Sequence, residues 1–265
     1  MKKDSRKGSR NQVKISLAMA TFNEEQNISR CLDAAEGWVD EIIVVDGGST
    51  DKTREVAEKY GAKVTKTTNP PIFHVNKQKA IDQCRGDWVL QLDADEVVES
   101  SLKKEILAIV KNGSGCAGYF IPRKNFFLGK WLRKTGQYPD PVIRLFKNGL
   151  GKLPCKSVHE QVEIKGKVGK LKGHLLHYPY PNFGEYLKKS NRYTSLTARE
   201  LKEEGLRPSL VEFTKAYWRF EKTFWSLYLR HKGFLDGFPG FVFSLFSGLH
   251  HLSAYIKFWE LSRKK

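Results

Sequence analysis

Cysteine is scarce in this 265-residue sequence, and none of its four cysteines stands in a C-x-x-C pair. Disulfide-stapled domains and structural zinc sites both depend on closely or regularly spaced cysteines. The wide spacing therefore predicts neither, and it favours a reducing cytoplasm as the protein's location. The four positions are Cys31, Cys84, Cys116 and Cys155.

Long apolar runs are also missing, since no stretch offers the roughly 18 uncharged apolar residues that a membrane-spanning helix needs. Residues 1–12 are basic, and we expect them to form a solvated tail. Lys14 interrupts the apolar run that follows, and no small-residue cleavage site comes after it. The sequence therefore predicts neither a clean membrane span nor a signal peptide.

Acidic residues are too few to balance the bases, because 29 Asp and Glu stand against 46 Lys and Arg and leave a formal net charge of +17. This excess predicts a polyanionic partner: nucleic acid, an anionic lipid surface or a phosphorylated substrate. No recognised basic-aromatic nucleic-acid motif is present, and the acids at 93–96 would repel phosphate unless a metal intervened. We therefore expect no nucleic-acid partner and keep a nucleic-acid-binding protein as the distant alternative.

Apolar strand patterns alternate with helical patterns over the first hundred residues. A parallel sheet with helices on both faces is the usual result of such alternation. The fold class predicted is therefore α/β. Strands are expected at 13–20, 41–45, 62–65 and 88–92, and helices at 26–37, after Asp51 as far as Gly61, and at 76–85.

Polar residues follow three of these strands directly, at 21–24, 46–51 and 93–96. In open parallel sheets, ligands bind at the carboxyl ends of the strands near a switch in strand order. Three polar strand ends in one half of the chain therefore predict a nucleotide site. The glycine pair at 47–48 allows a tight turn but lacks the G-x-G-x-x-G spacing of dinucleotide-binding loops.

The third strand end carries three acids within four residues, Asp93, Asp95 and Glu96. Neighbouring carboxylates repel one another and are most readily tolerated around a cation, so Asp93 and Asp95 are candidate ligands of a divalent metal. The alternative is a solvated helix start, where acids are favourable. We expect Glu96 to serve that helix start rather than the metal.

Together these three segments resemble the signatures of family 2 glycosyltransferases. The matching stretches are TFNE at 21–24, VVDGGSTD at 44–51 and LDADE at 92–96. The resemblance covers residues 13–100. It implies the A-type glycosyltransferase fold, a mostly parallel Rossmann-like sheet flanked by helices, together with a nucleotide-sugar donor and inversion at the anomeric carbon.

The resemblance also implies roles for individual residues. Asp95 would hold Mg²⁺ or Mn²⁺ on the donor diphosphate, and Asp93 would contact ribose or the metal. The residues that would line the nucleotide pocket are Thr21, Asn23 and Glu24, with Asp46 near the base or ribose.

Two positions qualify this match. Gly47 stands where many members of the family have an Asp that often faces uracil, although UDP remains the expected nucleotide. Lys77 stands where the family often has an Arg. It is expected either to contact the diphosphate or to be a solvated helix residue.

The second half of the chain offers candidates for the acceptor side. Glycosyl transfer to a hydroxyl needs a base, and a carboxylate in a partly desolvated cleft suits that role. The expected base is Glu160, on a strand over 157–162, with His159 orienting either this carboxylate or the acceptor; the pair resembles a motif of the lipopolysaccharide-core glucosyltransferase subgroup. Asp140 is the competing carboxylate, although its flanking prolines favour a turn. His177 is a candidate third metal ligand or a structural histidine.

The last sixty residues are rich in aromatics and bases. A helix is predicted over 210–229, with an aromatic stripe on one face and bases on roughly the opposite one. It would pack on the catalytic domain or, as we favour, lie in the membrane interface. The aromatic positions are Phe213, Tyr217, Phe220, Phe224 and Tyr228, and the basic ones Lys215, Arg219 and Lys222.

The sequence as a whole predicts a metal-dependent, inverting hexosyltransferase. The expected donor is a nucleoside-diphosphate sugar, with UDP-hexose as the expected form, and the expected acceptor is a hydroxyl of an anionic lipid-linked glycan such as lipopolysaccharide core. It would work at the inner face of the cytoplasmic membrane. A polyprenyl-phosphate glycosyltransferase is the alternative. The predicted segments are a donor half at 13–115, an acceptor half at 116–204 and an amphipathic helical extension at 205–265.

Overall fold

The computed structural model describes residues 13–156 and 160–263, and these residues form two compact units. Unit 1 holds the described residues up to Pro122 together with those from Pro141 to Leu175. Unit 2 consists of Arg123–Asp140 and the described residues from Leu176 onward. The basic tail predicted at residues 1–12 lies outside the described residues.

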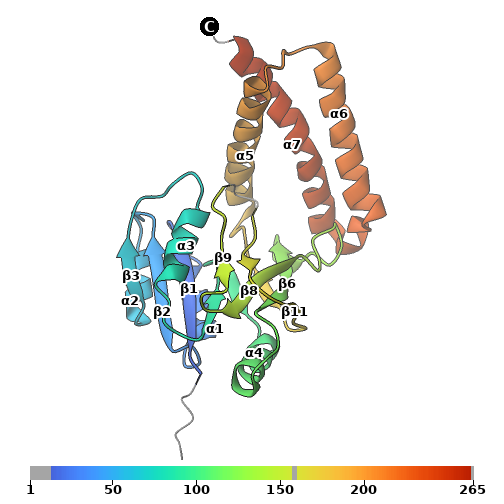
Figure 1. Cartoon of the computed structure of the whole chain (residues 1–265). Helices are drawn as coiled ribbons and strands as arrows, with labels where there is room; N and C mark the ends of the chain where they lie inside the picture. Colours follow the sequence, from blue (N-terminus) through green and yellow to red (C-terminus); the bar gives the residue numbers. More distant parts are fainter. Residues whose placement is uncertain (1–12, 157–159, 264–265) are drawn as a thin grey trace, which may run out of the picture. The chain divides into compact units, whose positions relative to one another are not determined.

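The centre of unit 1 is a sheet whose first four strands run parallel in the order β3-β2-β1-β4 (Figure 1). The antiparallel strand β8 then joins β4, and β6 joins β8. The four parallel strands are β1 (Ile15–Thr21), β2 (Glu41–Asp46), β3 (Lys63–Lys66) and β4 (Trp88–Gln91). β8 (Pro141–Lys147) runs antiparallel to both of its neighbours, β4 and β6 (Gly118–Phe127).

Shorter strands complete the sheet. Its order continues from β6 through β12 to β5, while β11 and β7 pair with β6, and β9 and β10 form a separate pair. Their bounds are β5 (Glu96–Val98), β7 (Lys130–Trp131), β9 (Gly151–Lys152), β10 (Glu163–Ile164), β11 (Val168–Lys170) and β12 (Leu175–His177).

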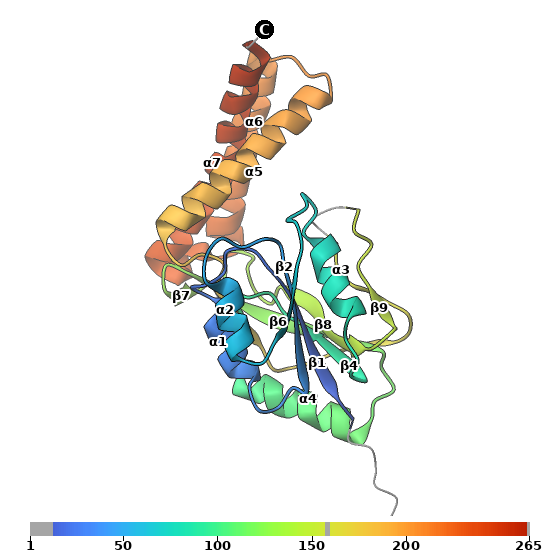
Figure 2. The same ribbon diagram turned by 90° about the vertical axis from the view of Figure 1, so that its left-hand side faces the viewer.

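Helices cover both faces of the parallel strands (Figure 2). Successive side chains of a strand point to opposite faces. Leu17 and Met19 therefore share one apolar core with the inner faces of α1 and α4, whereas Ala18 joins a second core with α3. The helices are α1 (Ile28–Ala35), α2 (Thr53–Lys59), α3 (His74–Asp82) and α4 (Ser100–Asn112). The predicted alternation of strands and helices is confirmed.

Unit 2 contains three long helices, of which α7 packs against both α5 and α6. A π-helical turn (Ser226–Arg230) and a short 3-10 helix (Gly233–Asp236) connect α6 to α7. No helix in residues 13–156 or 160–263 is both long and apolar enough to cross a bilayer. The long helices are α5 (Phe183–Glu203), α6 (Leu210–Trp225) and α7 (Gly237–Arg263).

The aromatic stripe of α6 contacts α7. Phe224 and Tyr228 lie edge-on to Phe241, with ring centroids 6.1 Å and 5.8 Å away, and Phe213 lies 5.6 Å from Tyr255. These contacts give the stripe a packing role inside unit 2. Membrane association of the C-terminal extension stays a prediction.

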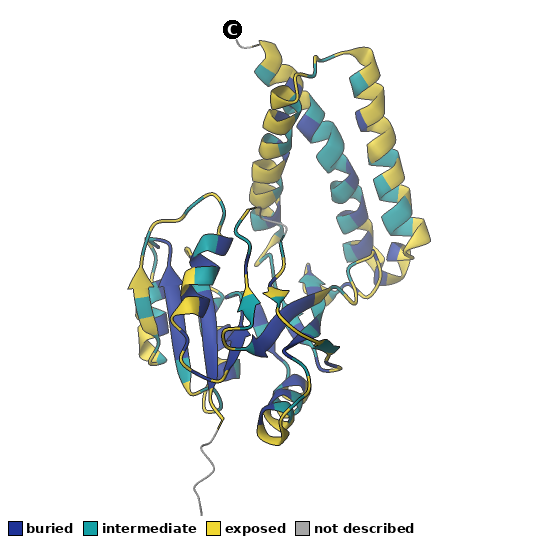
Figure 3. Ribbon diagram, viewed as in Figure 1, coloured by how far each residue is buried: buried dark blue, intermediate teal, exposed yellow. Residues whose placement is uncertain are grey.

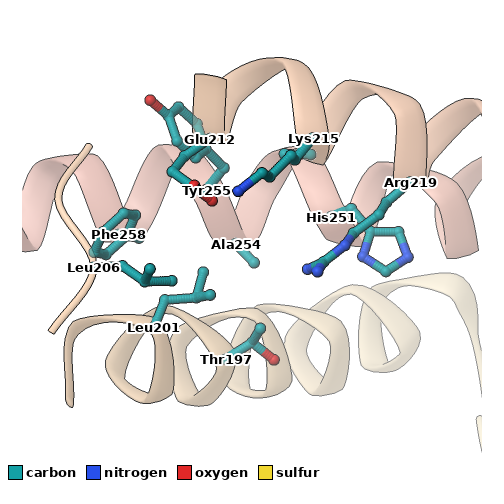
Figure 4. A pocket seen from close by; sticks show the side chains of 11 residues that line it. Thr197, Leu201, Leu206, Glu212, Lys215, Arg219, His251, Ala254, Tyr255 and Phe258 are labelled. Carbon is teal, nitrogen blue, oxygen red and sulfur yellow. Dashed lines mark hydrogen bonds and ion pairs between the residues drawn. The ribbon is translucent and has the colours of Figure 1, made fainter. Parts of the chain in front are cut away.

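A small cleft lies among the three helices of unit 2 (Figure 4). Arg219 of α6 lies beside His251 of α7, and Thr197 of α5 faces them. Burial lowers the pKa of His250 and of His251. Positive neighbours lower these pKa values further, Lys257 for His250, and His250 and Arg219 for His251. Protonation of either histidine is therefore unfavourable in this part of unit 2.

Candidate active site

The three polar strand ends lie at one edge of the parallel sheet. β1 is flanked by β2 and β4, with Thr21 directly opposite Asp46, and the amide of Leu92 donates to the carbonyl of Ala18. The chain runs outward from β1 through β2 to β3 and returns on the other side of β1 as β4. This is a topological switch point, where open α/β sheets bind their ligands.

Asp46 organises the loop after β2. Its carboxylate is fully buried and accepts hydrogen bonds from the amides of Gly48 (3.1 Å) and Ser49 (2.9 Å). The hydroxyls of Ser49 (2.5 Å) and Thr21 (3.1 Å) donate to its second oxygen. Asp46 thus fixes the turn and ties it to the end of β1; its predicted contact with a base or ribose stays a prediction.

The loop after β1 is joined to the same turn. The Asn23 amide donates to the Ser49 hydroxyl (2.9 Å), and the Asn23 side-chain oxygen accepts from the Thr50 amide (2.9 Å). The Glu24 amide donates to the Thr53 hydroxyl (2.7 Å). The backbone at residues 21–24 and 46–53 therefore forms one hydrogen-bonded rim. A rim of this kind is pre-organised, and the predicted nucleotide contacts of Thr21, Asn23 and Glu24 stay predictions.

The glycine at position 47 has a local explanation. A Cβ atom at Gly47 would lie 3.1 Å from the Cβ of Asn69, which is tighter than nearly all real contacts. The next residue, Gly48, has a φ of +89°, which side chains rarely adopt. The loop that carries Asn69 thus occupies the space that an Asp side chain at position 47 would need.

The acid cluster after β4 is partly neutralised by two cations of the protein itself. Asp93 pairs with the Lys77 ammonium (2.5 Å) through one oxygen and with the Arg144 guanidinium (2.6 Å) through the other. Arg144 also pairs with Glu96 (2.8 Å) and donates to the side-chain oxygen of Gln91. The predicted roles of Asp93 on ribose or metal and of Lys77 on the diphosphate stay predictions, and both groups are engaged with each other.

Glu96 corrects an expectation from the sequence. It was expected to begin a helix, but it lies in β5, is fully buried, and accepts a hydrogen bond from the Asp93 amide (3.0 Å). The helix α4 begins only at Ser100. A fully buried carboxylate requires a cation and hydrogen bonds, and Arg144 together with this amide supplies them.

Arg144 is the residue of this site that sequence reasoning missed. It lies on β8 within the apolar run at 141–146 and is only 8% exposed. Burial disfavours its charge, but the acids Asp93 and Glu96 outweigh this effect and raise the pKa of the guanidinium. A charged residue inside an apolar strand requires a buried partner, and this rule could have identified Arg144 from the sequence. For Lys77 the balance is opposite, because burial outweighs Asp93 and lowers the pKa of the ammonium.

Asp95 adds to the negative potential of the site. Burial is the main cause that raises the pKa of the Cys31 thiol well above its usual value, and the charges of Glu96, Asp95 and Asp93 raise it further. Within the described parts of the chain, no three His, Cys, Asp or Glu side chains are grouped so as to hold a metal ion. Mg²⁺ is commonly bound by one or two carboxylates plus substrate phosphates, so Asp95 fits such an ion when a diphosphate is present.

Glu160 lies next to His74 rather than on the predicted strand. Residues 160–162 have no regular secondary structure, so a strand there is wrong. Both Glu160 oxygens accept from the Lys156 amide at 3.0 Å, and His74 Nδ1 lies 3.9 Å from the carboxylate. His74 is buried and was missed from the sequence. His159 lies outside the described residues.

The two remaining candidates belong to unit 2. Asp140 forms an ion pair with Arg123 (2.6 Å) and accepts from the Asn125 amide group (2.9 Å), which gives it a structural role in its turn. His177, the last residue of β12, has its Nδ1 2.6 Å from the Asn125 side-chain oxygen. Its predicted role as a metal ligand stays a prediction.

Comparison with solved structures identifies the class of the fold. A crystallised fragment of S. aureus TarS, residues 1–349, matches 94% of this chain and 90% of its own length with a TM-score of 0.50 and 15% identity. The sheet, with its switch point and the acid cluster after its fourth strand, has the A-type fold of this class of structure. The predicted fold class is therefore confirmed.

Sequence comparisons give the family. Residues 16–164 match the model of glycosyl transferase family 2, and the chain belongs to that family. An uncharacterized glycosyltransferase of Rickettsia typhi is 32% identical, covering 95% of this chain and 88% of that relative. The lipopolysaccharide core biosynthesis glycosyltransferase LpsC of Rhizobium meliloti is 26% identical, covering 93% of this chain and 92% of its own length. The predicted enzyme class, a glycosyltransferase, is confirmed.

Proposed function

We propose that this glycosyltransferase moves a hexose from a UDP-sugar to a hydroxyl of an anionic lipid-linked glycan, of the lipopolysaccharide-core type. One observation carries the acceptor class: the similarity to LpsC extends over 93% of this chain and 92% of that protein, and so includes the acceptor half and the helical extension. The chain's charge of +17 suits a phosphorylated glycolipid acceptor. The place of action is the inner face of the cytoplasmic membrane.

The donor binds at the switch-point edge of the sheet. The rim at residues 21–24 and 46–53 surrounds the nucleoside, and Asp95 faces the diphosphate with Mg²⁺ or Mn²⁺. A divalent ion in this position supplies Lewis-acid stabilisation of the departing nucleoside diphosphate. The support for this placement is the convergence of all three polar strand ends within unit 1.

Glu160 acts as the base. The acceptor oxygen forms a bond to the anomeric carbon from the face opposite the leaving group, and its proton passes to the Glu160 carboxylate. The bond between the anomeric carbon and the diphosphate oxygen breaks, and its electron pair leaves with the nucleoside diphosphate, so the configuration inverts. The Lys156 amide, 3.0 Å from both oxygens, holds the carboxylate in place, and His74 lies 3.9 Å from it.

The donor half of the proposal is tested by Asp95→Ala. UDP binding measured by calorimetry should lose its dependence on Mn²⁺, while the fold, followed by circular dichroism, stays intact. Asp82→Asn is the matched control, because Asp82 is an acid at the end of α3 that takes no part in the site. Undiminished Mn²⁺-dependent binding by the Asp95 variant would refute the assignment.

The acceptor half is tested by Glu160→Gln. Removal of a general base should lower turnover roughly 100-fold or more. A polyprenyl-phosphate acceptor needs little base assistance, so that alternative predicts almost unchanged turnover. The control is Glu163→Gln, an exposed acid on β10. A panel of nucleotide sugars tested with and without Mn²⁺ identifies the donor.

A further inference from the structure

The turn that connects α6 to α7 exposes an unusual number of large apolar side chains. We call residues 226–238 together with the adjoining loop 130–136 the helical tip; all of it belongs to unit 2. Figure 3 shows exposed positions at the end of α6 where this turn begins. Its outward apolar residues are Leu229 (52% exposed), Phe234 (45%), Leu235 (57%) and Phe238 (72%).

The tip is held in this conformation by buried polar contacts. The Asp236 carboxylate is 2% exposed and accepts from the backbone amides of Arg133 (3.2 Å) and Lys134 (2.8 Å). Gly233 is packed so closely that a Cβ atom would lie 2.7 Å from the Thr135 side chain. The exposed apolar residues therefore belong to a turn that buried hydrogen bonds and close packing hold in place. Their exposure does not result from fraying of a helix end.

Exposed bases lie in the same segments as these apolar residues. The tip carries five exposed Lys and Arg side chains, and its single acid is the buried Asp236. An exposed apolar patch among bases matches an anionic lipid surface, where apolar groups enter the acyl boundary and cations meet headgroups. The bases are Lys130, Arg133, Lys134, Arg230 and Lys232.

We propose that the helical tip is a membrane-docking surface for anionic phospholipid. This inference rests on the proposed lipid-linked acceptor and deepens it by naming the surface that brings the enzyme to the bilayer. A second copy of the chain suits the tip poorly. A two-fold symmetric contact would place five bases against the same five bases, and like charges facing one another are unfavourable.

The test is flotation of the full chain with vesicles of phosphatidylcholine containing about one-third phosphatidylglycerol. The double variant Leu235→Ser with Phe238→Ser removes the two most exposed apolar groups and should weaken binding roughly tenfold or more. Arg230→Gln with Lys232→Asn should weaken it to a similar extent, since two bases near the surface are lost. Asn suits the φ of +57° at position 232.

A matched control distinguishes the tip from apolar surface in general. Leu210→Ser with Ile256→Ser removes two equally exposed apolar groups, 77% and 60%, at the far ends of α6 and α7. This variant should float like the unmodified protein, and pure phosphatidylcholine should bind all forms weakly. Equal flotation of the tip variant and this control would overturn the proposal. So would a dimer in sedimentation that the tip variant dissociates.

Hydrolysis of UDP-glucose in vesicle-free solution separates this proposal from the proposed function. The tip variants should match the unmodified protein, because no tip residue lies in unit 1, which holds the donor site. If no nucleotide sugar is turned over but tip-dependent flotation persists, the proposed function fails and the docking surface stands. If turnover is normal and flotation does not depend on the tip, only the proposal of a docking surface is refuted.

Discussion

Replacement of Arg144 by Met should destabilise unit 1 severely. The guanidinium is the shared partner of Asp93 (2.6 Å) and Glu96 (2.8 Å), and it also donates to Gln91. Without it, the fully buried Glu96 carboxylate loses this ion pair, while the Asp93 amide still donates to it. Asp93 keeps the ammonium of Lys77. The variant therefore takes a paired guanidinium away from a buried carboxylate.

The magnitude follows from the cost of an uncompensated buried charge, which is about 3–5 kcal/mol when one partner of a buried pair is removed. Whole domains are stable by only about 5–15 kcal/mol, so Arg144→Met should remove a large share of the stability of unit 1. For a chain of this size the melting temperature should fall by roughly 6–20 °C. Urea denaturation followed by circular dichroism and calorimetry measures the change.

Two further variants test the cause. Adding Glu96→Gln to Arg144→Met removes the stranded charge, so the double variant should be more stable than Arg144→Met alone. Lys147→Met is the control on the same strand; its ammonium lies 5.8 Å from the Trp88 ring, and its loss should cost about 1 kcal/mol or less. If the losses of Arg144→Met and Glu96→Gln simply add, the ion-pair explanation is refuted.

Three other predictions concern the rest of the chain. Because burial lowers the folded-state pKa of His250 and His251 below 6.5, the unfolded chain takes up these protons at a higher pH than the folded chain, so stability should fall as pH drops below about 6.5. Melting curves at pH 5 to 7 check this, and a double His→Gln variant that kept the same pH dependence would contradict it. Cys31, whose pKa burial and nearby acids raise, should resist iodoacetamide at pH 8 unless the protein is denatured, as peptide mapping can show. Asp46→Ala should lower the free energy of unfolding by about 1–3 kcal/mol, because the amides of the loop after β2 lose their acceptor; an unchanged urea midpoint would argue against that role.

The sheet and the edge where its polar strand ends lie together were predictable because strands and helices over the first hundred residues alternate with clear periodicity. Because the carboxyl ends of parallel strands lie at the same edge of a sheet, the polar residues after β1, β2 and β4 were expected to lie close together. Local patterns were sufficient here, since each of these elements is defined by residues close together in the sequence. The predicted strand was wrong at 160–162, the part of it that the structure describes, because a short polar-interrupted segment carries no such periodicity.

Long-range ion pairs were not predictable in the same way. Arg144 is 48 residues away from Glu96 and 51 from Asp93 along the chain, and only the pairing of β8 with β4 brings them together. The sequence pattern assigns Glu96 to a helix start because acids are common there. Glu96 is buried because β5 joins the far edge of the sheet, and no local sequence signal specifies that pairing.

The ion-pair network also changes how the metal should enter the site. Asp93, Asp95 and Glu96 carry three negative charges, and Lys77 and Arg144 supply two positive ones, so the described cluster has a net charge near −1. A single excess carboxylate charge holds a divalent ion weakly, whereas a nucleoside diphosphate brings further oxygen ligands of the kind that Mg²⁺ prefers. We therefore expect Mn²⁺ to bind the nucleotide-free protein weakly and UDP to increase the protein's affinity for Mn²⁺. By linkage, Mn²⁺ should increase the protein's affinity for UDP by the same factor. Calorimetric titration in both orders measures this coupling. Tight binding of Mn²⁺ to the nucleotide-free protein would mean that Asp93 is released from Lys77 and Arg144 to serve the metal.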